Sequence, residues 1–134
     1  MQLLTRKVSR AFIYDIGKKK FLIAKSTLPP FNFHLPGGGI GKKETAEQAV
    51  RRELKEELNI GSENIISISF LRKGKTKVLG FPHEMDIFAV SVHDLLIKLS
   101  WEIHAIRWVT LEELQAFIDK DCMVEMEELN KFIK

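Results

Sequence analysis

Three glutamates in the middle of the chain are spaced for a shared chemical task. Glu53, Glu56 and Glu57 are three and four residues apart, which places their carboxylates on one face of a helix. Like charges so close repel, and a divalent cation would convert that repulsion into coordination by oxygen ligands. The alternative is an ordinary solvated face, which helices rich in glutamate and lysine usually present. The pattern therefore suggests a metal site.

A glycine-rich turn precedes this acidic helix. Three consecutive residues, Gly37 to Gly39, give a backbone that can adopt positive φ and approach a ligand closely. A glycine-rich loop, a helix start and an acidic face together favour a metal–phosphate site. In such a site the metal would bridge phosphate oxygens to the carboxylates.

The wider spacing of these residues resembles the Nudix box, the signature of the Nudix hydrolase family. The segment from Gly38 to Ile60 carries the family's Gly, Glu, Arg, Glu, aliphatic, Glu, Glu and final aliphatic residues at the matching intervals. It departs at Asn59, where the family has glycine. That position ends the helix in the left-handed conformation, for which asparagine is the usual second choice.

The resemblance implies both a fold and a reaction. We expect a single Nudix hydrolase domain over residues 1–134, an α/β fold in which an α/β/α sandwich is built around a mixed β-sheet. The family hydrolyses a nucleoside diphosphate linked to another group, with Mg²⁺ or Mn²⁺ as cofactor. The residues after the box do not match the motifs that other subfamilies of this family carry there. By elimination we expect the substrate to be a (deoxy)nucleoside triphosphate, cleaved to the monophosphate and pyrophosphate.

The resemblance also implies which residues hold the metal. The ligands would be the carboxylates of Glu53, Glu56 and Glu57, together with the carbonyl of Gly37. Arg52 would orient a box carboxylate, a task that suits a planar, permanently charged guanidinium. Glu44 would support the start of the helix.

The general base and the substrate contacts are less specified. Glu53 or Glu56 is favoured as the base, and Glu102 is a further catalytic candidate that could equally be a loop carboxylate without a role. Substrate-binding candidates are Lys25, which could also be a plain surface lysine, and Gly38. Four aromatic residues are candidates for stacking on a nucleobase, of which we expect one or two to serve, with Phe33 preferred: Phe31, Phe33, Phe81 and Trp101.

The elements that must position these residues can be read from the pattern. Thr45 and Gln48 form a capping box, and apolar residues recur every four positions after it, so we expect a helix over 45–59. Strands are expected at 8–16, 21–25, 31–35, 65–71, 75–79, 84–92 and 104–109, with turns at Gly74 and at Phe81–Pro82. Further helices are expected from Thr110 and over 122–133, while 93–100 is ambiguous.

Composition sets the outer limits. The 134 residues are 45% hydrophobic and 29% charged, near the globular average, and hold one cysteine, Cys122, which excludes a disulfide within the chain. No apolar stretch approaches the ~18 residues that a membrane span needs. We therefore expect a cytoplasmic protein with a small nucleotide as its partner and no membrane association.

Charge is unevenly distributed and leaves alternatives open. Residues 1–43 hold nine Lys/Arg and one acid, whereas residues 44–134 hold twelve Lys/Arg and seventeen acids. The basic first third could attract an anionic substrate or a nucleic acid, or could be a solvated face. Alternative substrates are ADP-ribose or a sugar nucleotide, a dinucleoside polyphosphate and an RNA 5′ end. The alternative class is a non-catalytic nucleotide-binding module, and the oligomeric state stays open.

Overall fold

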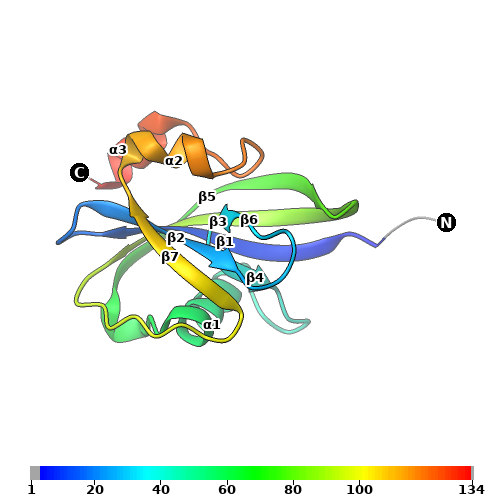
Figure 1. The fold of residues 1–134 in the computed structure, drawn as a ribbon, viewed down its shortest axis with the longest axis horizontal. Coiled ribbons are helices and arrows are strands. Elements are labelled where there is room, and N and C mark those ends of the chain that lie inside the picture. Colours follow the sequence, from blue (N-terminus) through cyan, green and yellow to red (C-terminus); the bar gives the residue numbers. More distant parts are fainter. Residues whose placement is uncertain (1–3, 134) are drawn as a thin grey trace.

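A mixed β-sheet between two helical layers forms the protein (Figure 1). The computed structural model describes residues 4–133. Helix α1 (Ala46–Leu58) covers one face of the sheet, while α2 (Leu111–Phe117) and α3 (Met126–Ile133) cover the other. The expected α/β/α sandwich is thus confirmed. Across the described residues, no helix combines the length and the apolar character that crossing a bilayer requires.

Seven strands and one short 3₁₀ turn complete the fold. Their order in the sheet is β3-β2-β1-β6-β5, with β4 paired to β1 and β7 paired to β2. The β1–β6 pair is parallel and the other pairs are antiparallel. The strands are β1 (Arg6–Asp15), β2 (Lys20–Ser26), β3 (Phe33–His34), β4 (Gly37–Gly39), β5 (Ile65–Val78), β6 (Phe81–Val92) and β7 (Ile103–Val109), and the 3₁₀ turn is Ser62–Asn64.

The sheet divides into two halves beyond the first hairpin. β1 and β2 pair only where Ile13–Asp15 face Lys20–Leu22. Further along, β1 takes β4 as its neighbour on this side, and β2 takes β3 and β7. The two halves therefore form a fork, and the loops and strands inside it can present polar groups without interrupting a continuous sheet.

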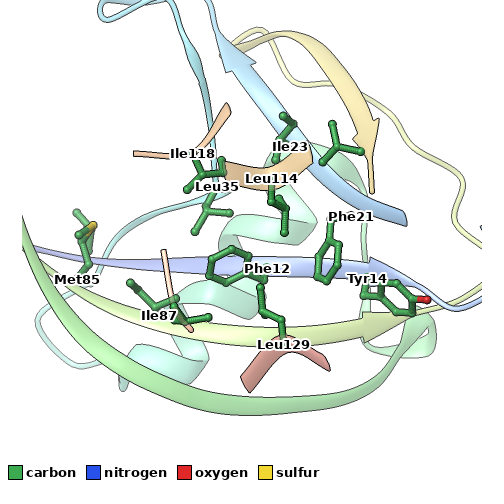
Figure 2. Packing of buried hydrophobic residues seen from close by; sticks show 13 residues of the cluster. Phe12, Tyr14, Phe21, Ile23, Leu35, Met85, Ile87, Leu114, Ile118 and Leu129 are labelled. Atoms are coloured by element: carbon green, nitrogen blue, oxygen red, sulfur yellow. The ribbon is translucent and has the colours of Figure 1, made fainter. Parts of the chain in front are cut away.

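Two apolar clusters hold the helices on the sheet. In the first, Phe12 and Phe21 from the sheet pack edge to face and meet Leu114 and Leu129 from α2 and α3 (Figure 2). In the second, Val50, Leu54 and Leu58 of α1 are fully buried against the opposite face. Burying such side chains contributes roughly 1.5–3 kcal/mol each, which fixes α1 and therefore its acidic face.

The helix boundaries follow the capping chemistry that the sequence indicates. Thr45 and Gln48 form the expected capping box at the start of α1, and Thr110 and Glu113 form a second one at the start of α2. At the end of α1, Asn59 adopts the left-handed conformation with φ of 62°. The capping box at Thr45, the helix start at Thr110 and the left-handed Asn59 are as expected.

The turn expected at Gly74 is wrong, because β5 runs through it without interruption. Gly74 pairs with Met85, and a Cβ on it would lie 3.1 Å from the carbonyl oxygen of Asp121. Here glycine allows the segment after α2 to approach the strand, rather than turning the chain. The chain reverses instead at Leu79 and Gly80, both with positive φ, as a tight hairpin requires.

Two other boundaries also differ from expectation. Phe81–Pro82 lies in β6 rather than in a turn. Proline is tolerated there because β1 joins β6 only from His83 onward, so no neighbour on that side needs its missing N–H. The last helix begins at Met126 rather than at 122, because turns occupy the preceding residues and Arg72 donates to the Met123 carbonyl. Residues 93–100 contain no helix.

Candidate active site

A cavity of about 500 Å³ opens in the fork of the sheet. One side carries the carboxylates of Glu53, Glu57 and Glu102, and another carries Arg6 and Arg10 from β1. The glycines of β4 lie between them. The remaining wall is largely apolar and includes Leu28, Pro29, Pro30, Phe33, Val78, Leu79, Met85, Ile103 and Ile118. The cavity thus combines an acidic side, a cationic side and an apolar wall.

Glu57 is a buried carboxyl group of the site. It is 6% exposed, and its Oε1 accepts a hydrogen bond of 3.2 Å from the Gly37 N–H. Burial, reinforced by the charge of Glu53, raises the pKa of Glu57 to about 7. A bound cation would reduce both the desolvation penalty of this buried carboxylate and its repulsion by the second carboxylate.

Arg52 organises the carboxylates around it. Its guanidinium donates to both oxygens of Glu44 at 2.8 and 2.9 Å, to Glu53 at 2.9 Å and to Glu56 at 3.3 Å. It also donates to the carbonyl of Gly39 at 3.0 Å. These hydrogen bonds hold the pKa of Glu44 at about 2 and raise the pKa of Arg52. Arg52 therefore ties the helix to the glycine strand and fixes one oxygen of Glu53.

The glycines of β4 allow the closest approaches in the site. A Cβ on Gly37, where φ is 143°, would lie 2.0 Å from the carbonyl oxygen of Ser9 on β1. A Cβ on Gly38 would lie 2.6 Å from the carboxyl carbon of Glu53. The absence of a side chain at Gly37 lets β4 pack against β1. Its absence at Gly38 lets the Glu53 carboxylate lie directly against the backbone of β4.

The segment that carries Glu102 is fastened to the end of α1. Lys98 N–H donates to the Leu58 carbonyl at 3.2 Å, and Ser100 N–H donates to the Glu57 carbonyl at 3.0 Å. The Asn59 side chain adds a 2.9 Å bond to the Leu96 carbonyl. The first two bonds satisfy carbonyls that the end of α1 leaves free. They also bring Glu102 to the cavity that Glu53 and Glu57 line.

The structure brings most of the sequence-predicted site residues together. The cavity is lined by Gly37, Gly38, Glu53, Glu57, Glu102 and Phe33. Arg52 and Glu44 lie behind Glu53 as one ion-pair network. The roles of these residues stay predictions.

The other predicted site residues lie outside the cavity lining. Glu56 is more than half exposed and pairs with Arg52. The Lys25 ammonium lies 5.9 Å from the centre of the Phe33 ring, behind a wall residue. Phe31, Phe81 and Trp101 are exposed.

Sequence reasoning missed several residues that line the cavity, among them Arg10, His34, His83 and Asp119. Arg10 carried a usable signal, because it alternates with Val8 and Phe12 and so places a charge on the inward face of a strand. Burial, together with nearby arginines, lowers the pKa of His34 and of His83, so both are neutral near pH 7. His83 and Asp119 come from distant segments, and no local pattern marks them.

The donor chemistry of the site fits a divalent cation such as Mg²⁺. Glu53 and Glu57 offer hard oxygen ligands at the same cavity, and burial, which raises the pKa of Glu57, is a penalty that a bound cation would offset. Within residues 4–133, no three Asp, Glu, His or Cys side chains are already gathered closely enough to hold a metal. Backbone carbonyls, water and substrate oxygens would complete the shell, as is usual for Mg²⁺.

Comparisons with known proteins agree on one family. A model described as the NUDIX domain matches residues 4–126. A search of curated protein sequences finds no match.

Solved structures share the fold at low identity. The Ap4A hydrolase of C. elegans, in a binary complex, is 22% identical with a TM-score of 0.77, and the match covers 96% of this chain and 98% of that one. The dihydroneopterin triphosphate pyrophosphohydrolase of E. coli is 18% identical with a TM-score of 0.76, covering 98% of each chain. The NUDIX domain of Shewanella oneidensis NrtR, complexed with ADP ribose, is 16% identical with a TM-score of 0.75, covering 98% of this chain and 90% of that one.

Proposed function

Because the chain belongs to the NUDIX family of hydrolases, we propose that it cleaves a (deoxy)nucleoside triphosphate to the nucleoside monophosphate and pyrophosphate. The observation that carries this proposal is one cavity with an acidic side from α1 and a cationic side from β1. Its volume of about 500 Å³ is in the range of sites that hold one small ligand. The apolar wall would take the base.

Mg²⁺ would be held by Glu53, Glu56, Glu57 and the Gly37 carbonyl, and when bound it neutralises phosphate charge and acidifies water. Glu56 would have to turn from Arg52 toward the cavity, which its exposed side chain permits.

The protein's own groups then order the hydrolysis. A water oxygen forms a bond to phosphorus in line with the bridging oxygen, and the bond from that phosphorus to the bridging oxygen breaks. The proton of the attacking water passes to Glu53, at Oε2, because Oε1 accepts from Arg52. Arg52 thereby orients the base, and its links to Glu44 and Gly39 keep it in place. Glu102 lies at the same cavity as an additional acidic group.

A nucleotide panel tests the substrate class. The kcat/KM would be compared for (d)NTPs, ADP-ribose, a sugar nucleotide, a dinucleoside polyphosphate and 5′-triphosphate RNA, each with Mg²⁺ and with Mn²⁺. We expect the highest value for a nucleoside triphosphate, with pyrophosphate as the product. A higher value for another substrate would replace the proposed class. Tight nucleotide binding without turnover of any of them would support the non-catalytic module.

The remaining expectations are parts of the same proposal. We infer a small-molecule partner and a reducing cytoplasmic setting, which suits a chain with Cys122 as its single cysteine. DNA or RNA binding through the basic first third would show itself as a steep loss of affinity with added salt.

A further inference from the structure

Arg10 is a cation on the inward face of a core strand. Its neighbours on that face of β1, Val8 and Phe12, are at most 1% exposed. Arg10 itself is only partly exposed, so its charged guanidinium is poorly solvated. Placing an arginine there instead of an apolar residue costs free energy, so the position calls for a compensating interaction.

The hydrogen bonds within the protein use only part of the guanidinium. Nη1 donates to the Gly37 carbonyl at 3.1 Å and, less closely, to the Leu35 carbonyl at 3.4 Å. Among residues 4–133, no carboxylate lies within 4 Å of Arg10. The only fully buried side-chain polar atom without a partner in this range is Ser9 Oγ. Nε and Nη2 of Arg10 are therefore not fully buried, and they are open to the cavity that Arg10 lines.

Arg52 shows by contrast what an arginine looks like when groups of the protein itself satisfy its guanidinium. Its Nε, Nη1 and Nη2 all donate, to three carboxylates and one carbonyl. Arg10 keeps Nε and Nη2 without such partners. The difference indicates that the missing partner of Arg10 comes from outside the chain.

The position of Arg10 says which part of a ligand it would meet. The Gly37 N–H donates to Glu57 and the Gly37 carbonyl accepts from Arg10, so a single residue, Gly37, separates the acidic side of the cavity from this cation. Arg6 lies on the same face of β1 and also lines the cavity. A ligand that spans from the carboxylates to these arginines needs negative charge at the arginine side.

We propose that Arg10 is a substrate-binding residue that donates two hydrogen bonds to anionic oxygens of the substrate's phosphate chain. A guanidinium matches phosphate geometry with parallel donors, which an ammonium does not. The proposal rests on the proposed function only in taking the ligand to be a phosphorylated nucleotide. It predicts that hydrogen bonds from Arg10 to the phosphates, rather than contacts with the base, offset the free energy of desolvating the Arg10 charge.

Binding without turnover tests this assignment. Calorimetry in Mg²⁺ would compare wild type with Arg10→Gln for three ligands: pyrophosphate, an α,β-imido deoxynucleoside triphosphate and the unphosphorylated nucleoside. Glutamine keeps an N–H₂ donor for the Gly37 carbonyl but carries no charge. Lys7→Gln is the matched control, because it removes one positive charge from the same strand. Lys7 is exposed and does not line the cavity.

We expect Arg10→Gln to weaken pyrophosphate and the imido analogue at least tenfold, and Lys7→Gln to change them less than twofold. Arg10→Lys should recover part of the loss. Equal affinities in wild type and Arg10→Gln would overturn the proposal, as would a loss of the same size for the nucleoside. Because no turnover is involved, a failed hydrolysis panel would not be mistaken for failure of this assignment.

A measurement on the wild-type protein covers the case in which Arg10→Gln does not fold. The Nε–H signal of Arg10 in an NMR spectrum, assigned by its absence in Arg10→Lys, should shift on addition of pyrophosphate and not on addition of the nucleoside. An unmoved signal at saturating pyrophosphate would contradict the proposal.

Discussion

At the scale of single residues, two arginines mark the two sides of the site. Arg52 is surrounded by Glu44, Glu53 and Glu56, and these contacts raise its pKa. Arg10 has only carbonyl partners, and burial lowers its pKa. The same residue type therefore has two roles: Arg52 positions a carboxylate, and Arg10 is proposed to bind an anionic group of the substrate. The family motif indicates the first, whereas the second is marked only by the alternation of Arg10 with Val8 and Phe12 along β1.

Two adjacent glycines should respond differently to alanine. Gly37→Ala places a Cβ against the Ser9 carbonyl at positive φ, so we expect unfolding stability to fall by about 3 kcal/mol or more. Gly38→Ala meets only the end of the Glu53 side chain, which can swing away. Its stability should change by less than about 1 kcal/mol while activity falls about tenfold or more. Urea unfolding and kcat of both variants check this, and the reverse order of the two stability losses would contradict the geometry.

The raised pKa of Glu57 predicts a pH effect on the metal-free protein. The folded state binds this proton up to about pH 7, whereas the unfolded chain releases it near its ordinary pKa of 4.5. Stability attributable to Glu57 is therefore lost as pH rises from about 4.5 to 7, by on the order of 3 kcal/mol. In EDTA, Glu57→Gln should raise the Tm relative to wild type at pH 8 and much less at pH 5. A Tm difference that does not vary between these pH values would rule out the buried, uncompensated carboxylate.

At the scale of elements, the departure from the family motif has a structural use. Asn59 ends α1 in a left-handed conformation that glycine could also adopt, but its side chain additionally donates to the Leu96 carbonyl. Lys98 and Ser100 then donate to the last carbonyls of the helix. The segment 94–102 is thus held along the end of α1, and Glu102 follows from it into the cavity.

Asn59→Gly should loosen that segment without unfolding the protein. The backbone conformation suits glycine, so the Tm should change by only a few degrees. The Lys98 and Ser100 amides should exchange hydrogen about fivefold faster, as expected from a lost hydrogen bond worth about 1 kcal/mol. Amides between β5 and β6 serve as the internal control. Exchange that is unchanged at both amides would show that Asn59 only ends the helix.

Elements with a local signal were predictable, and those fixed by tertiary contacts were not. Helix α1 follows from a capping box and an apolar period, and both appear as predicted. Gly74 reads locally as a turn, yet β5 continues through it because β6 offers partners along its whole length. β4 is a run of three glycines without strand propensity, and it becomes a strand because β1 pairs with it.

At the scale of the whole molecule, the site exists because the sheet divides. The part of its acidic side that comes from α1 was predictable from the spacing of Glu53 and Glu57, whereas Glu102 joins it from the segment before β7. Its cationic side and apolar wall come from β1, from the 26–35 segment and from the tip of the β5–β6 hairpin. No local pattern connects these segments, so the cavity becomes visible only when the fold brings them together.

We propose that the acidic face of α1 carries out phosphoanhydride hydrolysis in this cavity. The most direct measurement is the Mg²⁺-dependent release of monophosphate and pyrophosphate from a deoxynucleoside triphosphate by wild type, Glu53→Gln and Glu47→Gln. Glu47 lies on the same helix, is exposed and pairs with Arg51, so it controls for the loss of one carboxylate. We predict a loss of at least about 10²-fold in kcat for Glu53→Gln and none for Glu47→Gln. Equal kcat values for Glu53→Gln and wild type would contradict the account.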